Sequence, residues 1–250
     1  MCTVVCRWSP GVAVPVEMLA LRDELVSRSF EVPSAWWRDQ PRVVGGRDRL
    51  GGGTWCASDV AAGVTAVVLN RAERRVAAPG APSRGVLPLL AVRALERWPA
   101  FIDLAPMASF NLVLATPESL IWWSYDGTTL VTHALQPGTH MWTPRGLALP
   151  LLDNRFAQGH AHLDVGRAGA TELVWTDWLA IIQDSEPSDD PLALLVRIPH
   201  GEDSFETVFG QFIAAWPGTL RLDYAIKPDR SQSWTVDHWT IQSDLATRLS

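Results

Sequence analysis

Lysine is almost absent from this chain of 250 residues, because Lys227 is the only one and arginine supplies nearly all of the positive charge. Acidic residues outnumber basic ones, and the formal net charge is −6. A surface that binds phosphate groups needs a clustered excess of lysine and arginine. An anionic membrane surface requires a similar basic patch. We therefore expect neither nucleic acid nor an anionic membrane as a partner.

Long hydrophobic runs are also missing. A helix that spans a membrane needs about 18 or more apolar residues in succession. The longest candidate, residues 11–21, is interrupted by Pro15 and Glu17. A secretory signal would place a positively charged segment before an apolar one, and the start of the chain lacks this pattern. We expect a cytoplasmic protein without a membrane span.

Cysteine is scarce as well, with Cys2, Cys6 and Cys56 as its three occurrences. A low, odd number gives no disulfide framework, and the spacings do not match a zinc site. We expect no metal and no cofactor, and we interpret Cys6 and Cys56 as small buried hydrophobic residues. Apolar residues make up 47% of the chain, which is enough for a substantial core.

Predicted strands form hairpin-like groups that helices separate. This order favours antiparallel sheets covered by helices over a doubly wound parallel sheet. We predict one α+β domain over residues 1–250, with two antiparallel sheets between two helical layers in an αββα sandwich. Strands are predicted at 2–8, 12–21, 54–58, 64–69, 111–115, 119–124, 129–135, 192–198, 220–226 and 233–241, and helices at 86–98, 170–183 and 204–216.

Cys2 is placed where it can become the first residue of the mature protein, because an initiator methionine is commonly removed before a small residue. One residue would then carry a thiol, with a pKa of about 8.5, and an α-amine, with a pKa of about 7.7–8.0. An amine with a pKa near ambient pH is suited to accept the proton of the thiol. A small residue buried in a strand is the other interpretation of Cys2.

Several short elements follow in order along the first 140 residues. Each element alone is a weak indication of a protein family, so the evidence lies in the order in which the elements occur together. They are Leu21-Arg22-Asp23-Glu24, Gly45-Gly46-Arg47-Asp48, Gly51-Gly52-Gly53-Thr54-Trp55, Leu69-Asn70-Arg71, Ser83-Arg84-Gly85, Phe110-Asn111-Leu112 and Pro137-Gly138-Thr139-His140.

This series resembles the NRDE family of transport and Golgi organisation proteins, which is named after an Asn-Arg-Asp-Glu element. Leu21 stands here in place of the asparagine. The resemblance implies an αββα fold like that of N-terminal-nucleophile amidohydrolases, with Cys2 as the nucleophile. In related cysteine amidohydrolases an arginine and an aspartate follow the nucleophile by about one hairpin, which is the position of Arg22 and Asp23.

Three further candidate catalytic residues can be assigned roles. Arg22 would lower the pKa of the thiol through its positive charge, and Asp23 would hold the α-ammonium group. The alternative for this pair is a structural ion pair. Asn70 would donate its amide to an oxyanion, or it is a turn residue at the end of a strand. Pro144 stands where many family members have an asparagine, so a second oxyanion donor is missing at that point.

Substrate binding is assigned to two arginines and two tryptophans. Arg47 and Arg71 would bind a substrate carboxylate, or they brace the glycine-rich loops. Trp36 and Trp37 lie in a predicted loop, where they would contact an apolar ligand, although core packing is the usual role of tryptophan.

Two functions remain open from the sequence. The first is a cysteine amidohydrolase that cleaves a linear C–N amide bond in a small amide or acyl substrate. The second is a non-catalytic ligand-binding or trafficking protein for a haem-like or lipid-like molecule. The sequence leaves the oligomeric state open.

Overall fold

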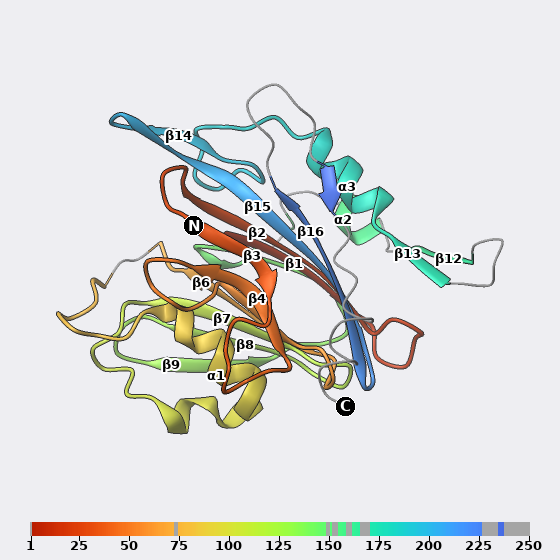
Figure 1. Cartoon of the computed structure of the whole chain (residues 1–250), viewed down its shortest axis with the longest axis horizontal. Helices are drawn as coiled ribbons and strands as arrows, with labels where there is room; N and C mark the ends of the chain where they lie inside the picture. The colour runs from red at the N-terminus through yellow and green to blue at the C-terminus, as the bar shows by residue number, and fades with distance from the viewer. Residues whose placement is uncertain are drawn as a thin grey trace.

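The structure is a computed structural model that describes residues 2–72, 75–148, 151, 155–158, 162–165, 171–226 and 235–237. In this part of the chain, antiparallel strands form two large sheets and one small hairpin. Helices are few and short (Figure 1). None of the described helices is long and apolar enough to cross a membrane.

The first sheet is built around the N-terminal hairpin, in which β1 (Cys2–Trp8) pairs with β2 (Val16–Leu25). Its strand order is β11-β10-β1-β2-β15-β16-β17, with β14 paired to β15. The other strands are β10 (Gly138–Thr143), β11 (Gly146–Leu147), β14 (Arg197–His200), β15 (Asp203–Trp216), β16 (Thr219–Ile226) and β17 (Thr235–Asp237).

The second sheet is a meander in which each strand pairs with the next along the chain. It contains β3 (Phe30–Ser34), β4 (Val43–Asp48), β5 (Cys56–Asp59), β6 (Val64–Asn70), β7 (Phe110–Ala115), β8 (Leu120–Tyr125) and β9 (Leu130–Ala134). The separate hairpin joins β12 (His162–Val165) to β13 (Thr171–Val174).

The described helices belong to two regions of the chain (Figure 1). Pro88 lies in the first turn of α1, where its missing N–H removes no helical hydrogen bond. The structure confirms the helix predicted at 86–98 as an α-helix from Leu87 to Ala94, and a 3₁₀ segment from Leu95 to Phe101 follows it. The helical segments are η1 (Arg84–Val86), α1 (Leu87–Ala94), η2 (Leu95–Phe101), α2 (Arg155–Gln158) and α3 (Thr176–Gln183).

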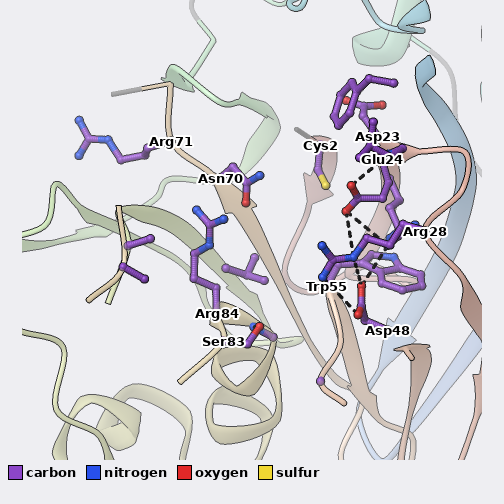
Figure 2. A pocket seen from close by; sticks show the side chains of 18 of the residues that line it. Cys2, Asp23, Glu24, Arg28, Asp48, Trp55, Asn70, Arg71, Ser83 and Arg84 are labelled. Atoms are coloured by element: carbon purple, nitrogen blue, oxygen red, sulfur yellow. Dashed lines mark hydrogen bonds and ion pairs between the residues drawn. The ribbon is translucent and has the colours of Figure 1, made fainter. Parts of the chain in front are cut away.

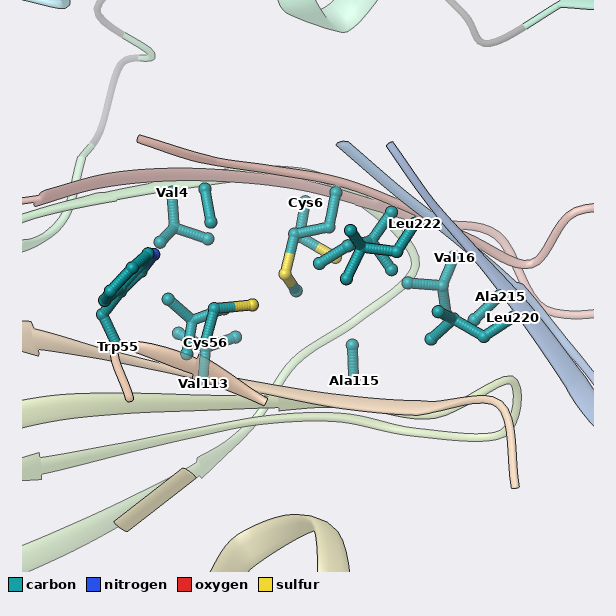
Figure 3. Packing of buried hydrophobic residues seen from close by; sticks show 14 of the residues in the cluster. Val4, Cys6, Val16, Trp55, Cys56, Val113, Ala115, Ala215, Leu220 and Leu222 are labelled. Atoms are coloured by element: carbon teal, nitrogen blue, oxygen red, sulfur yellow. The ribbon is translucent and has the colours of Figure 1, made fainter. Parts of the chain in front are cut away.

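Alternate residues of β1 enter different hydrophobic clusters, because successive side chains of a strand point to opposite faces. Val4 and Cys6 pack in a cluster that contains Val113 of the second sheet (Figure 3). Val5 packs instead with Phe156 of α2 and Trp178 of α3. The first sheet thus contributes to a core shared with the second sheet and to a core shared with two helices.

The outer side of the second sheet has its own cluster. Leu112 and Leu114 of β7 pack there with Leu87 and Val92 of α1. Figure 1 shows α1 beside this sheet.

The predicted helix at 204–216 is wrong, because these residues form most of β15. This strand lies between β2 and β16 and is almost continuously buried from Glu206 to Ala215. A strand with both faces buried lacks polar alternation, so its apolar run resembles that of a buried helix.

Smaller differences concern the ends of elements. The second strand begins at Val16 rather than residue 12 and continues to Leu25. The predicted helix 170–183 is replaced by β13 followed by α3, with residue 170 outside the described residues. Of the strand predicted at 192–198, only Arg197 and Ile198 belong to a strand, β14, which continues to His200. Of the strand predicted at 233–241, β17 is described and the flanking residues are not. The strands β3, β4, β10, β11 and β12 and the helix α2 were not predicted.

Candidate active site

A cavity of about 670 Å³ lies at the start of β1, between the two sheets and the segment that follows β6. Cys2, Arg22 and Asp23 line it from the N-terminal hairpin, and Asn70 and Arg71 line it from the end of β6. The structure therefore brings together the four predicted catalytic residues and one of the predicted substrate-binding residues. A volume of 300–1,000 Å³ is typical of sites for small molecules.

Cys2 and Arg22 are placed together by the register of the hairpin. The Cα atoms of the two residues are directly paired across β1 and β2, and paired residues of an antiparallel ladder share one face. Only 9% of the Cys2 surface is exposed. Burial raises the pKa of the Cys2 thiol, and the charge of Asp23 adds to this effect. Arg22 and a hydrogen bond from the Asp23 backbone act in the opposite direction.

Arg22 is a buried cation, with 2% of its surface exposed. Nη2 donates to Asp48 Oδ2 at 3.2 Å and lies 3.5 Å from Glu24 Oε2. The guanidinium carbon lies 4.6 Å from the ring centroid of Trp55 and 5.0 Å from that of Phe30, which are cation–π distances. Nη1 is also buried, and it has no hydrogen-bond acceptor among the described residues.

Asp23 is 4% exposed and accepts a hydrogen bond of 2.7 Å from Thr207 Oγ1 on β15. Burial raises the pKa of its carboxyl group to about 6, although the bond from Thr207 lowers it. A carboxyl group with this pKa exchanges its proton close to neutral pH.

Asp48 holds Arg22 and a second arginine in position. Arg28 makes two bonds to the Asp48 carboxylate, from Nε at 2.8 Å and from Nη2 at 3.2 Å. Backbone N–H groups of Leu50 and Gly51 also donate to Asp48 Oδ1. Burial raises the pKa of Asp48, but the bonds from Arg28 and Gly51 outweigh it and lower the pKa overall. Figure 2 shows this network beside Cys2.

The sequence did not assign a role to Arg28 or Glu24. Glu24 was visible only as part of a motif, and Arg28 belongs to no recognised element. The contact of Arg28 with Asp48 joins residues 20 positions apart, and no local pattern indicates such a contact.

The other side of the cavity carries Asn70 and Arg84, which face the hairpin residues across the cavity in Figure 2. Asn70 is the last residue of β6, and its side chain makes no hydrogen bond to a described residue in the structure. Arg84 Nη1 donates to the carbonyl oxygen of Ser109 at 2.9 Å. Arg71 Nη1 donates to Ser124 Oγ at 2.9 Å.

The remaining predicted substrate-binding residues do not line the cavity. Arg47 forms an ion pair with Glu31, and its guanidinium carbon lies 4.8 Å from the ring centroid of Trp36. The indole of Trp36 donates to the carbonyl of Val32 at 2.9 Å. Trp37 lies against the cluster on the outer side of the second sheet. These contacts fit the bracing role that was the alternative for Arg47 and the packing role that was the alternative for the tryptophans.

A metal ion has no evident place in the part of the chain that the structure describes. No group of three or more histidine, cysteine, aspartate or glutamate side chains there is arranged to hold one.

Comparison with known proteins identifies the family. The model of the family described as Transport and Golgi organisation 2 matches residues 1–166, and no curated protein matches the chain. The matched region covers about two thirds of the chain and includes Cys2, Arg22, Asp23, Asn70 and Arg84. The chain therefore belongs to the Transport and Golgi organisation 2 family.

Proposed function

We propose that this protein is an N-terminal-nucleophile cysteine amidohydrolase that cleaves a linear C–N amide bond in a small substrate. The observation that carries the proposal is the direct pairing of Cys2 with Arg22 at a cavity of about 670 Å³, with Asp23 as the next residue. A thiol, a cation and a buried carboxyl group thereby line one cavity.

The proposal includes the αββα arrangement of one domain over residues 1–250. It is supported by the three hydrophobic clusters. One combines residues of both sheets, a second joins the second sheet to α1, and a third joins the first sheet to α2 and α3.

The reaction begins with a mature chain from which Met1 has been removed. Burial keeps the resting Cys2 thiol protonated, because it raises the pKa. The α-amine of Cys2 then accepts the thiol proton as the sulfur attacks the amide carbonyl carbon. A C–S bond forms, and the carbonyl π electrons move to oxygen. Asn70 donates its amide N–H to this oxyanion, and the buried Nη1 of Arg22, which has no acceptor among the described residues, offers a second donor.

Collapse of this intermediate breaks the C–N bond and leaves a thioester on Cys2. The α-ammonium group returns the proton to the leaving nitrogen, which departs as an amine. Water then attacks the thioester with the α-amine again as the base. The products are a carboxylic acid and the regenerated thiol. In this cycle Asp23 holds the α-ammonium group, and its raised pKa limits the charge that it places beside the sulfur.

Intact mass spectrometry with an acylating p-nitrophenyl ester tests the proposal. We expect a chain without Met1 that gains one acyl group, located on Cys2. Cys2→Ala should remove the labelling and the amidase activity while the protein stays folded. Cys56→Ala is the matched control, because Cys56 is fully buried and burial raises its pKa to about 12. Retained Met1, or full turnover by Cys2→Ala, would contradict the mechanism.

A second candidate function is non-catalytic binding of a haem-like or lipid-like ligand. Two observations favour it: the pKa of the Cys2 thiol is raised rather than lowered, and Leu25, Val68 and Phe205 add apolar surface to the cavity. It predicts saturable binding of such a ligand with the same affinity in wild type and Cys2→Ala. A panel of haem and fatty acids that shows no binding would exclude it.

A further inference from the structure

Three neighbouring strands place a row of apolar residues at the cavity. Phe205 of β15 is directly paired with Leu25 of β2 on one side and with Ile198 of β14 on the other. Directly paired residues of antiparallel strands share one face of the sheet. All three side chains are half-buried and line the cavity. None of them belongs to the three hydrophobic clusters that the described residues form. This apolar row therefore contributes its surface to the cavity rather than to the core.

The apolar row lies close to the candidate catalytic residues. Leu25 follows Asp23 by two residues on β2, so the two side chains share a face and lie about 7 Å apart along the strand. The Cys2 thiol accepts a hydrogen bond from the Asp23 backbone. In Figure 2, Asp23 and Asn70 lie on opposite sides of Cys2. A group bonded to the sulfur can therefore extend to the apolar row on the Asp23 side while its carbonyl oxygen faces Asn70.

Hydrogen bonds hold the apolar row in place. The backbone N–H of Val26 donates to the carbonyl oxygen of Ser204 at 2.9 Å, and Ser27 Oγ donates to Asp203 Oδ2 at 2.5 Å. Both bonds join the end of β2 to the start of β15, beside the paired residues of the row. A surface that is already ordered loses little conformational freedom when a ligand binds to it. The row is thus a preformed part of the cavity.

Two of the three residues lie outside the region that matches the family. The family model matches residues 1–166, and all the candidate catalytic residues lie within it. Ile198 and Phe205 belong instead to the hairpin of β14 and β15. The proposed chemistry therefore resides in the matched region, whereas this hairpin supplies most of the apolar row.

We propose that the β14–β15 hairpin determines which substrate is accepted, because its part of the apolar row binds an aryl or alkyl group in the acyl part of the substrate. This inference rests on the proposed function and specifies its substrate class. The acyl group stays bonded to Cys2 in the thioester, whereas the amine leaves and a water molecule must take its place. An apolar surface disfavours water, so it suits the acyl group rather than the amine. A ring that is two methylene groups from the carbonyl carbon can span about the 7 Å between the rows.

Nuclear magnetic resonance titration of the Cys2→Ala protein measures binding without turnover. The probe N-methyl-3-phenylpropanamide carries a ring on the acyl side of its amide. Its isomer N-(2-phenylethyl)acetamide carries the ring on the amine side, and N-methylpropanamide has no ring. We expect the first amide to bind about tenfold or more tightly than N-methylpropanamide, because burial of a ring has at least this effect on affinity. It should also bind more tightly than its isomer.

Variants assign the preference for the ring to the hairpin. Adding Phe205→Ala should reduce this preference about fivefold or more. Binding of N-methylpropanamide should stay unchanged, which reports an intact cavity. Phe205→Leu should retain part of the preference, because leucine keeps hydrocarbon in the row. Phe101→Ala is the matched control, because Phe101 is 60% exposed and does not line the cavity.

Three results would overturn the inference. They are equal binding of N-methyl-3-phenylpropanamide and N-methylpropanamide, tighter binding of the isomer with the ring on the amine side, and an unchanged preference in Phe205→Ala.

Turnover by proteins that retain Cys2 separates the two proposals. If these amides are hydrolysed but Phe205→Ala leaves the preference among them unchanged, the amidohydrolase proposal stands and the inference fails. If the ring binds through Phe205 but no amide is cleaved, the apolar row is confirmed as a binding surface and the amidohydrolase proposal fails.

Discussion

Replacing Asp23 with asparagine removes a buried negative charge from the candidate site at almost constant volume. Asparagine keeps a carbonyl oxygen that can accept the hydrogen bond from Thr207, which lies 2.7 Å from the carboxylate. The substitution therefore tests the charge with little change in packing. We expect the variant to be more stable than wild type at neutral pH and to lose amidase activity.

The expected gain follows from the pKa. Burial raises the pKa of Asp23 from 3.8 to about 6, so the folded protein binds this proton more tightly than the unfolded chain. The protonated carboxyl group contributes its full stabilisation below pH 4. This contribution is lost as the pH rises through 6, where the buried carboxyl group ionises. A difference of about 2 pKa units corresponds to about 3 kcal/mol. Relaxation around the charge reduces this value, so we expect a gain of about 1–3 kcal/mol at pH 8.

Urea denaturation of wild type and Asp23→Asn at pH 4, 6 and 8 measures the effect. The free energy of unfolding of the variant should exceed that of wild type at pH 8, and the difference should close at pH 4. A gain that is the same at all three pH values would show that packing, not ionisation, causes it. Equal stability at pH 8 would refute the assignment of a raised pKa to Asp23.

Three further substitutions test the surroundings of the site and the core. Asp126→Asn should have the opposite pH dependence, because hydrogen bonds from Thr129 and Thr128 lower the pKa of Asp126 to about 2. Wild type should therefore be more stable than the variant at pH 7. Urea denaturation should show this difference in stability closing as the pH falls below 4. Gly53→Ala should destabilise the protein by about 1–3 kcal/mol, because a Cβ atom would lie 2.5 Å from the backbone carbonyl carbon of Gly85, and thermal unfolding measures this loss. Phe212→Ala should cost about 3–5 kcal/mol in the same measurement, since its ring is fully buried.

Local pairing explains which parts of the fold could be predicted. The hairpins β1–β2, β5–β6 and β7–β8 join strands that follow one another in the chain, with turn residues between them. Apolar runs bounded by turn residues were therefore sufficient to predict these strands. The long strand β15 was mistaken for a helix because it pairs with β2, whose residues lie between 180 and 199 positions earlier in the chain. Its burial on both faces depends on that distant partner.

The candidate site could be predicted in part for the same reason. Cys2 and Arg22 belong to one hairpin, and their pairing follows from its register. Trp36 and Trp37 were assigned to ligand binding because they lie in a loop, but loop residues also pack on nearby surfaces, as both do here. Arg84 was recognised only as part of a motif. Its place across from Cys2 depends on how the segment after β6 returns to the cavity, which the sequence does not reveal.

The register of the first hairpin links the core to the proposed chemistry. Val4 and Ala20 are paired and enter the cluster between the sheets, whereas Val5 and Leu19 enter the cluster beneath α2 and α3. A slip of β2 by one residue would exchange these faces, because side chains alternate along a strand. Arg22 would then leave the face that carries Cys2, and its cation–π contacts would be lost. Hydrophobic burial along the whole hairpin therefore holds the guanidinium group beside the sulfur. The exposed turn between the two strands does not need to specify that position.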